Sequence, residues 1–299
     1  MFDQISIIGC GLIGSSIFKG LKKVGSIKKI ITYDNDKSVN EIIKKDKLSD
    51  EIFKTAGDAV KNSDLVIIAT PISSFEKVLN SIKDNLKAGS ILTDTCSVKI
   101  GVSKTFEKMN IKNSVCIPGH PVAGIENSGP EAGFADLFKN RWTILTPNKK
   151  IDGEAIKKLS SFWESMGSKV KIMTDEDHDK ILTFTSHLPH VIAYNIVKTS
   201  MSNDTSVKDD IIKYSAGGLR DFTRIAASDP VMWRDIFIDN SALIIQAIEK
   251  FIKNLDEFKK AISEKDGNKL VEIFEKSKDF RKSVIKAGQD TDKPDFGRK

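Results

Sequence analysis

The sequence is poor in cysteine and has no long apolar run. Its 299 residues include three scattered cysteines, Cys10, Cys96 and Cys116, which form no CxxC pair. This pattern argues against a disulfide framework and favours a reducing, cytoplasmic compartment. The longest apolar run, residues 65–69, is too short to cross a bilayer, and no basic leader precedes the first apolar segment. We therefore expect neither a membrane span nor a signal peptide.

Dense basic segments are missing as well. The formal net charge is +6, but the lysines are spread along the chain. Because no basic block is interleaved with aromatic residues, the sequence does not support nucleic-acid binding. Steering of anionic ligands and an ordinary solvated lysine surface both remain as explanations of the charge.

Short apolar segments alternate with amphipathic ones over residues 1–174. The expected strands are 5–8, 27–33, 65–69, 90–93, 114–117, 142–145 and 169–174. Helical patterns such as 75–85 and 153–166 lie between them. This alternation predicts an α/β dinucleotide-binding domain with a Rossmann-like, doubly wound parallel sheet. Ligands of such sheets bind at the carboxyl ends of the strands.

The pattern becomes helical after residue 174. We predict an all-α substrate and dimerisation domain over 175–287, followed by a polar tail, 288–299. Two apolar helical faces carry this prediction, Ile244, Ile248, Phe251, Ile252 and Leu255 on one and Leu270, Ile273 and Phe274 on the other. A second subunit would bury such faces, and packing within one chain is the alternative.

A glycine motif follows the first expected strand. Gly9, Gly11 and Gly14, with Leu12 and Ile13 between the last two, fit G-x-G-x-x-G at the start of an expected helix. The first glycine permits a tight turn, the second lets the backbone approach a pyrophosphate, and the third lets the helix lie close to the strand. The helix N-terminus then offers amide hydrogens to the phosphates.

An acidic residue stands where a dinucleotide site requires one. Asp34 lies 20 residues after Gly14, at the end of the second expected strand, and would bind the adenosine ribose hydroxyls. It would also repel a 2′-phosphate, so NAD is the predicted cofactor. A simple turn residue is the alternative for Asp34. We also assign Thr70 and Pro71, which follow the third expected strand, to the cofactor site.

Five further segments, taken in order, resemble the prephenate and arogenate dehydrogenase family. They are Thr93–Lys99, Pro118–Gly124, Ser186–His190, Gly218–Arg224 and Ser228–Arg234. The resemblance covers nearly the whole chain, from about residue 5 to about residue 285, and is to the minimal form without a fused mutase or ACT domain. It implies a homodimer.

The resemblance also implies a reaction. An NAD(P)-dependent oxidation removes a hydride from C4 of a cyclohexadienol ring while carbon dioxide leaves. Prephenate then gives 4-hydroxyphenylpyruvate, and arogenate gives tyrosine. This chemistry needs a neutral proton acceptor beside the C4 hydroxyl and cationic donors for two carboxylates.

His120 suits the acceptor role, because it stands in an expected loop after a strand of the cofactor domain. An imidazole with a pKa near ~6.5 is largely neutral at cytosolic pH. A loop histidine that only orders the turn is the alternative. Ser97 matches the family serine that hydrogen-bonds this histidine and the substrate hydroxyl, although a helix N-cap would also explain it.

The family pattern places His190 and Glu126 near the substrate and makes Asp179 a supporting aspartate. For Glu126 a surface carboxylate is the alternative. His187 shares a helical face with His190, and we favour a core role for it. His178 lies in an acidic run and is expected to be exposed. A metal site that combines these histidines with Asp175 matches no ligand motif.

Arg224 is the candidate for carboxylate binding, because a guanidinium fits a carboxylate with two hydrogen bonds. Asp221, three residues earlier, would hold Arg224 in place, and a surface ion pair is the alternative. Trp233 matches a family tryptophan near the substrate, and a core residue is its alternative.

Two other functions remain open on the sequence. Another two-domain dehydrogenase, of the β-hydroxyacid or imine-reductase kind, would share the fold and Asp34 but leaves the segments around His120 and Arg224 unexplained. A non-catalytic NAD-binding sensor would share the cofactor site and lack turnover.

The role of Asp34 gives a test of cofactor choice. The wild-type chain should prefer NAD strongly over NADP, because the Asp34 carboxylate and a 2′-phosphate repel each other. Asp34→Ser should narrow this preference, measured as the ratio of kcat/KM with the two cofactors. Equal wild-type efficiency with both cofactors would contradict the assignment.

Overall fold

The computed structural model describes residues 2–25, 27–202 and 204–289. They form two compact units that divide between Ile244 and Ile245. The predicted polar tail lies outside the described residues from residue 290 onward. The boundary predicted at residue 174, between the cofactor domain and the helical domain, stays a prediction.

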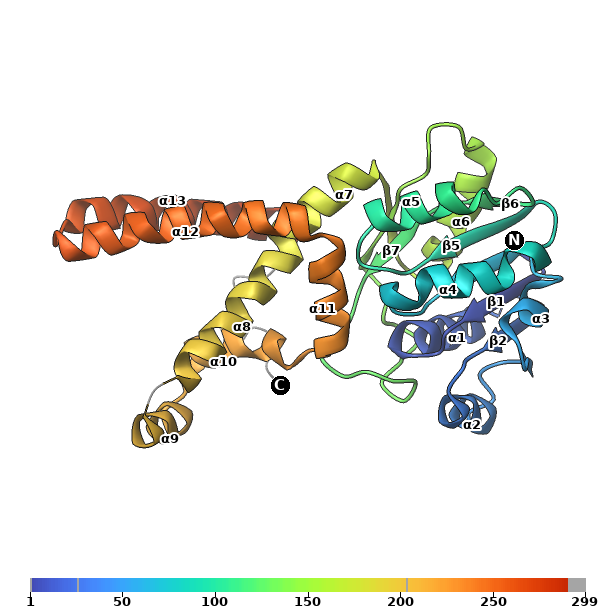
Figure 1. Ribbon diagram of the computed structural model, residues 1–299, viewed down its shortest axis with the longest axis horizontal. Helices are drawn as coiled ribbons and strands as arrows, with labels where there is room; N and C mark the ends of the chain where they lie inside the picture. The colour runs from blue at the N-terminus through green and yellow to red at the C-terminus, as the bar shows by residue number, and fades with distance from the viewer. Residues whose placement is uncertain (1, 26, 203, 290–299) are drawn as a thin grey trace. The chain divides into compact units, whose positions relative to one another are not determined.

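A parallel sheet of six strands forms the centre of the first unit (Figure 1). Its order across the sheet is β3 (Glu51–Ile52), β2 (Lys29–Tyr33), β1 (Gln4–Ile8), β4 (Leu65–Ile68), β5 (Ser90–Asp94) and β6 (Ser114–Cys116). The strand order reverses between β1 and β4, and dinucleotides bind at the carboxyl edge of such a reversal. The predicted Rossmann-like fold is confirmed.

Helices cover both faces of this sheet, because successive strand residues point to opposite sides. Ile5 and Ile7 of β1 pack toward α1 (Leu12–Val24), α2 (Lys37–Lys45) and α6 (Gly153–Ser165). Ile8 packs on the opposite face toward α3 (Ala56–Val60), α4 (Ile72–Ile82) and α5 (Ile100–Met109). A 3-10 turn, η1 (Lys83–Asn85), extends α4. The strands are therefore buried on both sides, as their continuous apolar runs predict.

A second, smaller sheet carries His120. The strand β7 (Gly119–Val122) pairs antiparallel with β8 (Trp142–Leu145), which pairs parallel with β9 (Lys169–Ile172). The sequence did not predict β3 or β7. In particular, the expectation that His120 lies in a loop is wrong, because His120 is the second residue of β7. Its neighbours Gly119 and Pro121 are residues that strands disfavour, so no strand pattern was visible.

Helices follow β9 and return to the sheet. They are α7 (Asp175–Leu182), a π-helical turn η2 (Thr183–His187), α8 (Leu188–Met201), α9 (Thr205–Lys213), α10 (Gly217–Arg224), a 3-10 turn η3 (Ile225–Ala227) and α11 (Pro230–Asp239). Asp229 caps α11 by accepting the N–H of Met232 at 2.8 Å, and Pro230 stands at the first helical position, which proline favours. The helix α7 packs against α5, and α11 against α4. Residues from the helical half thereby reach the sheet.

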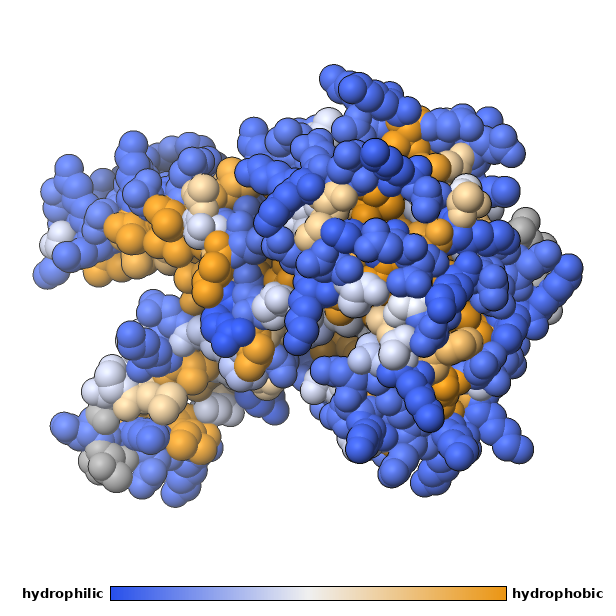
Figure 2. Space-filling model, turned by 45° about the vertical axis from the view of Figure 1, so that its right-hand side comes forward, coloured by the Kyte–Doolittle hydropathy of each residue, from blue (hydrophilic) through white to orange (hydrophobic). Residues whose placement is uncertain are grey.

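The second unit is a helical hairpin. The helix α12 (Ser241–Ser263) begins at the end of the first unit, and α13 (Gly267–Lys286) lies beside it, with Phe258 and Phe274 in ring contact. In the described part of this unit, residues 245–289, seven large apolar residues expose between 52% and 74% of their surface: Ile245, Ile252, Leu255, Ile262, Val271, Phe274 and Phe280. Apolar side chains are visible along this hairpin in the upper left of Figure 2. Within the described residues no helix is long and apolar enough to cross a membrane.

The glycine turn gives a matched pair of substitutions. A Cβ at Gly14 would lie 2.1 Å from the carbonyl oxygen of Gly9, whereas a Cβ at Gly11 would meet no atom within 4 Å. Gly14→Ala should therefore lower the melting temperature of the cofactor-free protein. Gly11→Ala should keep the wild-type melting temperature and weaken only dinucleotide binding, measured by calorimetry. The same melting temperature for both variants would contradict this packing.

Candidate active site

The glycine motif forms an open turn at the carboxyl end of β1. Gly9 has a φ of +93°, which favours glycine, and an added Cβ would lie 2.7 Å from Thr70 Cγ2. Thr70 and Pro71, which follow β4, therefore flank the same turn. The helix α1 begins at Leu12 with no side-chain cap on Gly11, so its first amides remain for a ligand. The space at Gly11 and these amides fit a pyrophosphate.

Asp34 lies one residue past the end of β2, beside this turn. Its carboxylate accepts the N–H of Cys10 at 2.7 Å through Oδ2 and the N–H of Asp36 at 2.9 Å through Oδ1. The main chain of the glycine motif thus holds the carboxylate at the edge of the dinucleotide site. The turn-residue alternative describes the contact with Asp36 and leaves the contact with Cys10 unexplained.

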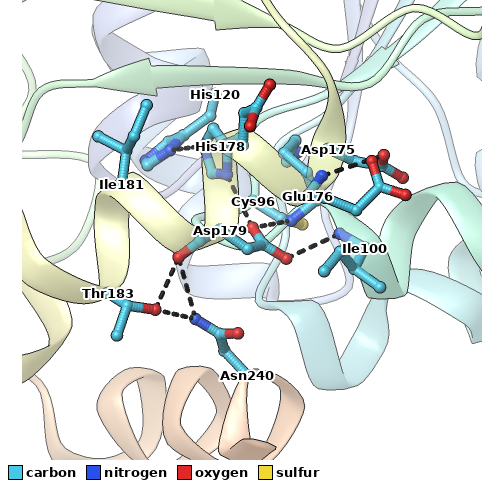
Figure 3. A network of polar contacts seen from close by, with 12 residues as sticks. Cys96, Ile100, His120, Asp175, Glu176, His178, Asp179, Ile181, Thr183 and Asn240 are labelled. Atoms are coloured by element: carbon cyan, nitrogen blue, oxygen red, sulfur yellow. Dashed lines mark hydrogen bonds and ion pairs between the residues drawn. The ribbon is translucent and has the colours of Figure 1, made fainter. Parts of the chain in front are cut away.

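The second part of the site is a chain of three polar side chains (Figure 3). His120 Nδ1 lies 2.8 Å from His178 Nε2, and His178 Nδ1 lies 2.7 Å from Asp179 Oδ1. All three side chains are buried. Asp179 also accepts the N–H of Lys99 at 2.8 Å and the N–H of Ile100 at 2.9 Å, at the N-terminus of α5. A carboxylate at this position is stabilised by the positive end of the helix.

This chain determines which nitrogen of His120 is basic. A carboxylate accepts, so His178 Nδ1 carries a hydrogen and its Nε2 accepts in the neutral ring. His120 Nδ1 must then donate to His178, which leaves His120 Nε2 with a lone pair. Among the described residues His120 Nε2 has no hydrogen-bond partner. His120 is therefore arranged as a neutral base with Nε2 free.

Burial keeps these imidazoles neutral. Desolvation first, and then His178, Lys99 and His187, lower the pKa of His120 well below its usual 6.5. Desolvation also lowers the pKa of His178, although the hydrogen bond to Asp179 opposes the effect. One expectation from the sequence is corrected here: His178 is buried and not exposed.

The remaining two histidines lie beside this chain. His187 is buried, as expected. Its Nδ1 accepts a hydrogen bond from Asn240 Nδ2 at 3.0 Å, so its Nε2 carries the ring hydrogen. This Nε2 has no hydrogen-bond partner among the described residues. His190 Nδ1 donates to the carbonyl of Ser186 at 2.8 Å. Its ring stacks on Trp233 with 3.5 Å between the centroids. Trp233 is buried, yet its Nε1 lacks a partner in this part of the chain.

Arg224 and Glu126 meet, although 98 residues separate them. Arg224 Nη1 forms an ion pair with Glu126 Oε1, and the other guanidinium nitrogens have no hydrogen-bond partner in the described residues. A hydrogen bond to its own main-chain N–H and the bond to Arg224 outweigh desolvation and lower the pKa of Glu126. His190 is near enough that Arg224 adds to desolvation in lowering the pKa of His190. Asp221 is exposed in α10, and its predicted support of Arg224 stays a prediction.

Ser97 lies half-buried in the loop after β5, and its hydroxyl has no hydrogen-bond partner among the described residues. The N-cap of α5 is Lys99, without a side-chain cap bond, so the N-cap alternative for Ser97 is wrong. Within residues 2–25, 27–202 and 204–289 no group of His, Cys, Asp and Glu side chains has the arrangement of a metal site.

Sequence reasoning missed two contributors to the site, His178 and Lys99. Three acidic residues precede His178 and suggest solvent exposure, but Leu182 stands four residues later and shares its buried helical face. That spacing was the available signal for His178. No signal in the sequence marks Lys99 as a buried lysine.

The buried histidines predict a loss of stability in mild acid. His120, His178 and His187 titrate near ~6.5 in the unfolded chain, whereas burial lowers their pKa in the native state, that of His187 to about 4. Between these values the unfolded state binds more protons, so the free energy of unfolding should fall as pH drops from 7 to 5, by up to about 1.4 kcal/mol per pH unit for each histidine.

Denaturant titrations at pH 7, 6 and 5 measure this effect, with His187→Gln as a variant that should show a shallower slope. Most carboxylates change little in this window, since their usual pKa values lie below it, and Asp239, whose pKa burial raises, would oppose the trend. A free energy of unfolding that stays constant between pH 7 and 5 would show that these histidines are not neutral and buried.

Comparisons with known proteins match both parts of the chain. Residues 17–172 match the family model of the prephenate dehydrogenase nucleotide-binding domain, and residues 174–276 match that of the prephenate dehydrogenase dimerization domain. The chain is 38% identical to the cyclohexadienyl dehydrogenase of Zymomonas mobilis over 94% of its own length and 96% of that protein. It is 31% identical to the prephenate dehydrogenase of Bacillus subtilis, over 94% and 76% of the two chains.

A solved structure is similar over the same range. The prephenate dehydrogenase of A. aeolicus, in complex with hydroxyphenyl propionate and NAD+, is 34% identical and superimposes with a TM-score of 0.87. The match covers 95% of this chain and 99% of that one. Two family models match the chain, and its relatives are more than 30% identical over nearly its full length. The chain therefore belongs to the prephenate dehydrogenase family.

Proposed function

We propose that this chain catalyses the NAD-dependent oxidative decarboxylation of prephenate, arogenate or both, a step of tyrosine biosynthesis. The observation that carries the proposal is the buried chain from Asp179 through His178 to His120, which ends in a free, neutral Nε2. Gly119, next to His120, donates its N–H to Asp94 at the carboxyl end of β5, the edge where the cofactor binds. A base and a dinucleotide site thus share one edge of the sheet.

NAD fits the residues at the glycine turn. Gly9, Gly11 and Gly14, with the amides of Leu12 and Ile13, would hold the pyrophosphate, Asp34 the adenosine ribose, and Thr70 and Pro71 the far side of the turn. Bound NAD supplies the acceptor for the hydride that leaves C4 of the ring. Membership of the prephenate dehydrogenase family and the NAD+ in the A. aeolicus structure support this assignment.

His120 handles the proton in this reaction. The C4 hydroxyl gives its proton to Nε2 as the C4 hydride departs, and a carbonyl forms at C4. When the ring carboxylate leaves as carbon dioxide, the bond electrons aromatise the ring and return charge to the same oxygen. His120 can give the proton back to that oxygen, so no proton is gained or lost overall. Ser97 would hydrogen-bond the hydroxyl and orient it toward Nε2.

The substrate carboxylates need fixed cations and donors. Arg224 keeps guanidinium N–H groups free of protein partners and would bind a carboxylate through them. Glu126 would orient Arg224, and His190, stacked on Trp233, would line the same side of the site. Asp221 remains a candidate support of Arg224, and Asp179 supports the base.

We also propose that the chain is a cytoplasmic homodimer. The helical hairpin of the second unit leaves seven large apolar residues half or more exposed, and a second copy would bury them. The match of residues 174–276 to a dimerization domain supports this. The three cysteines are free, which is consistent with a reducing compartment. Sedimentation that shows a fully active monomer at micromolar concentration would contradict the dimer.

A turnover assay tests the proposed function. NADH formation with prephenate and with arogenate should be seen for the wild-type chain, while a 3-hydroxy acid should give none. His120→Asn should lower kcat by about 10²–10⁴, because Asn hydrogen-bonds but cannot take the proton. Its NAD affinity should be unchanged in calorimetry. No turnover with either substrate, or a His120→Asn variant with wild-type kcat, would overturn the proposal.

A further inference from the structure

Lys99 is a buried lysine at the junction of the two parts of the site. It stands between β5 and α5, and its side chain is fully buried. A buried ammonium is costly unless it is paired and hydrogen-bonded. Neither the cofactor site nor the proton transfer described above uses this charge.

The side chain of Lys99 holds the strand of the base. Its Nζ forms an ion pair with Asp94 and donates to the carbonyl of Gly119 at 2.6 Å. Asp94 Oδ1 in turn accepts the N–H of Gly119 at 3.0 Å. Both main-chain groups of the residue before His120 are therefore bound to this one ion pair.

The main chain of Lys99 holds the other end of the histidine chain. Its N–H donates at 2.8 Å to Asp179 Oδ1, the same oxygen that lies 2.7 Å from His178 Nδ1. A single residue thus contacts the strand that carries His120 and the carboxylate that orients His178.

We propose that Lys99 is the positioning residue of the base: its side chain fixes the β7 strand, its main-chain N–H fixes Asp179, and the His120–His178 contact is held between them. The proposal rests on the proposed role of His120 as proton acceptor. The ammonium has a second effect, because a fixed cation disfavours another positive charge nearby.

The charge environment of His120 agrees with this arrangement. After desolvation, His178 of α7, Lys99 before α5 and His187 of η2 each lower the pKa of His120. Asp94 is tied to Lys99, and Asp179 faces His120 only through His178. Removal of the Lys99 charge should therefore make His120 easier to protonate.

The experiment removes the ion pair without leaving one buried charge. The double variant Asp94→Asn/Lys99→Met keeps similar volumes, and replacement of both members of a buried pair is commonly tolerated. Asp94→Asn alone is a second variant, which breaks the ion pair and keeps the Lys99 side chain beside the carbonyl of Gly119. Lys108→Met, which breaks the exposed Lys108–Glu76 pair, is the matched control.

Three measurements are made: steady-state kinetics (kcat and KM) with prephenate and NAD, the pH profile of kcat, and the titration of the His120 imidazole by proton NMR in the substrate-free protein. In the double variant kcat should fall by about 10- to 100-fold, the scale of a misplaced catalytic group, with KM little changed. The acid limb of kcat and the NMR midpoint of His120 should both move to higher pH. Lys108→Met should match the wild type in all three.

A folded double variant with wild-type kcat and an unmoved His120 midpoint would overturn the proposal. If the double variant does not fold, Asp94→Asn alone decides: it breaks the same ion pair and the bond to the Gly119 N–H, so kcat should fall, and a wild-type kcat would overturn the proposal. The NMR titration needs no turnover, so it separates failure of the Lys99 proposal from failure of the proposed reaction, which inactive wild-type protein would reveal.

Discussion

The carboxylate of Asp179 is the point on which the site depends. It is buried, and its two oxygens receive main-chain hydrogens from Lys99 and Ile100 and the Nδ1 hydrogen of His178. A buried charge is tolerated only when it is bonded in this way. Because the carboxylate can only accept, it fixes the hydrogen on every nitrogen between itself and His120 Nε2.

This constraint joins three parts of the chain that are distant in sequence. Asp179 and His178 come from α7, the amides come from the start of α5, and His120 comes from the second sheet. The packing of α7 on α5 brings the helical segment to the carboxyl edge of the parallel sheet. Asn240, at the end of α11, donates to Thr183, as Figure 3 shows. It also donates to His187, so a further helix is tied to the same cluster. Proton acceptor, support and dinucleotide turn therefore form one assembly within the first unit.

The sequence predicts what local spacing determines. Gly9, Gly11, Gly14 and Asp34 lie within one strand–helix–strand unit, so their roles follow from their order, and the parallel sheet follows from apolar alternation. Contacts between segments that are distant in sequence cannot be predicted from local spacing. The strand β7 is made by pairing with β8, although its glycine and proline are poor strand residues. His178 looked exposed because its neighbours are acidic, and the burial of Lys99 depends on Asp94 and Gly119, whose proximity only the fold creates.

The protonation state of His120 tests the central claim most directly. Nitrogen-15 NMR of the substrate-free protein, with the four imidazoles assigned by single substitutions, distinguishes a protonated nitrogen from a bare one. At pH 7 we predict that His120 is neutral, with hydrogen on Nδ1 and a bare Nε2, and that His178 has the same tautomer. A His120 that carries its hydrogen on Nε2, or that is positively charged at pH 7, would contradict the account.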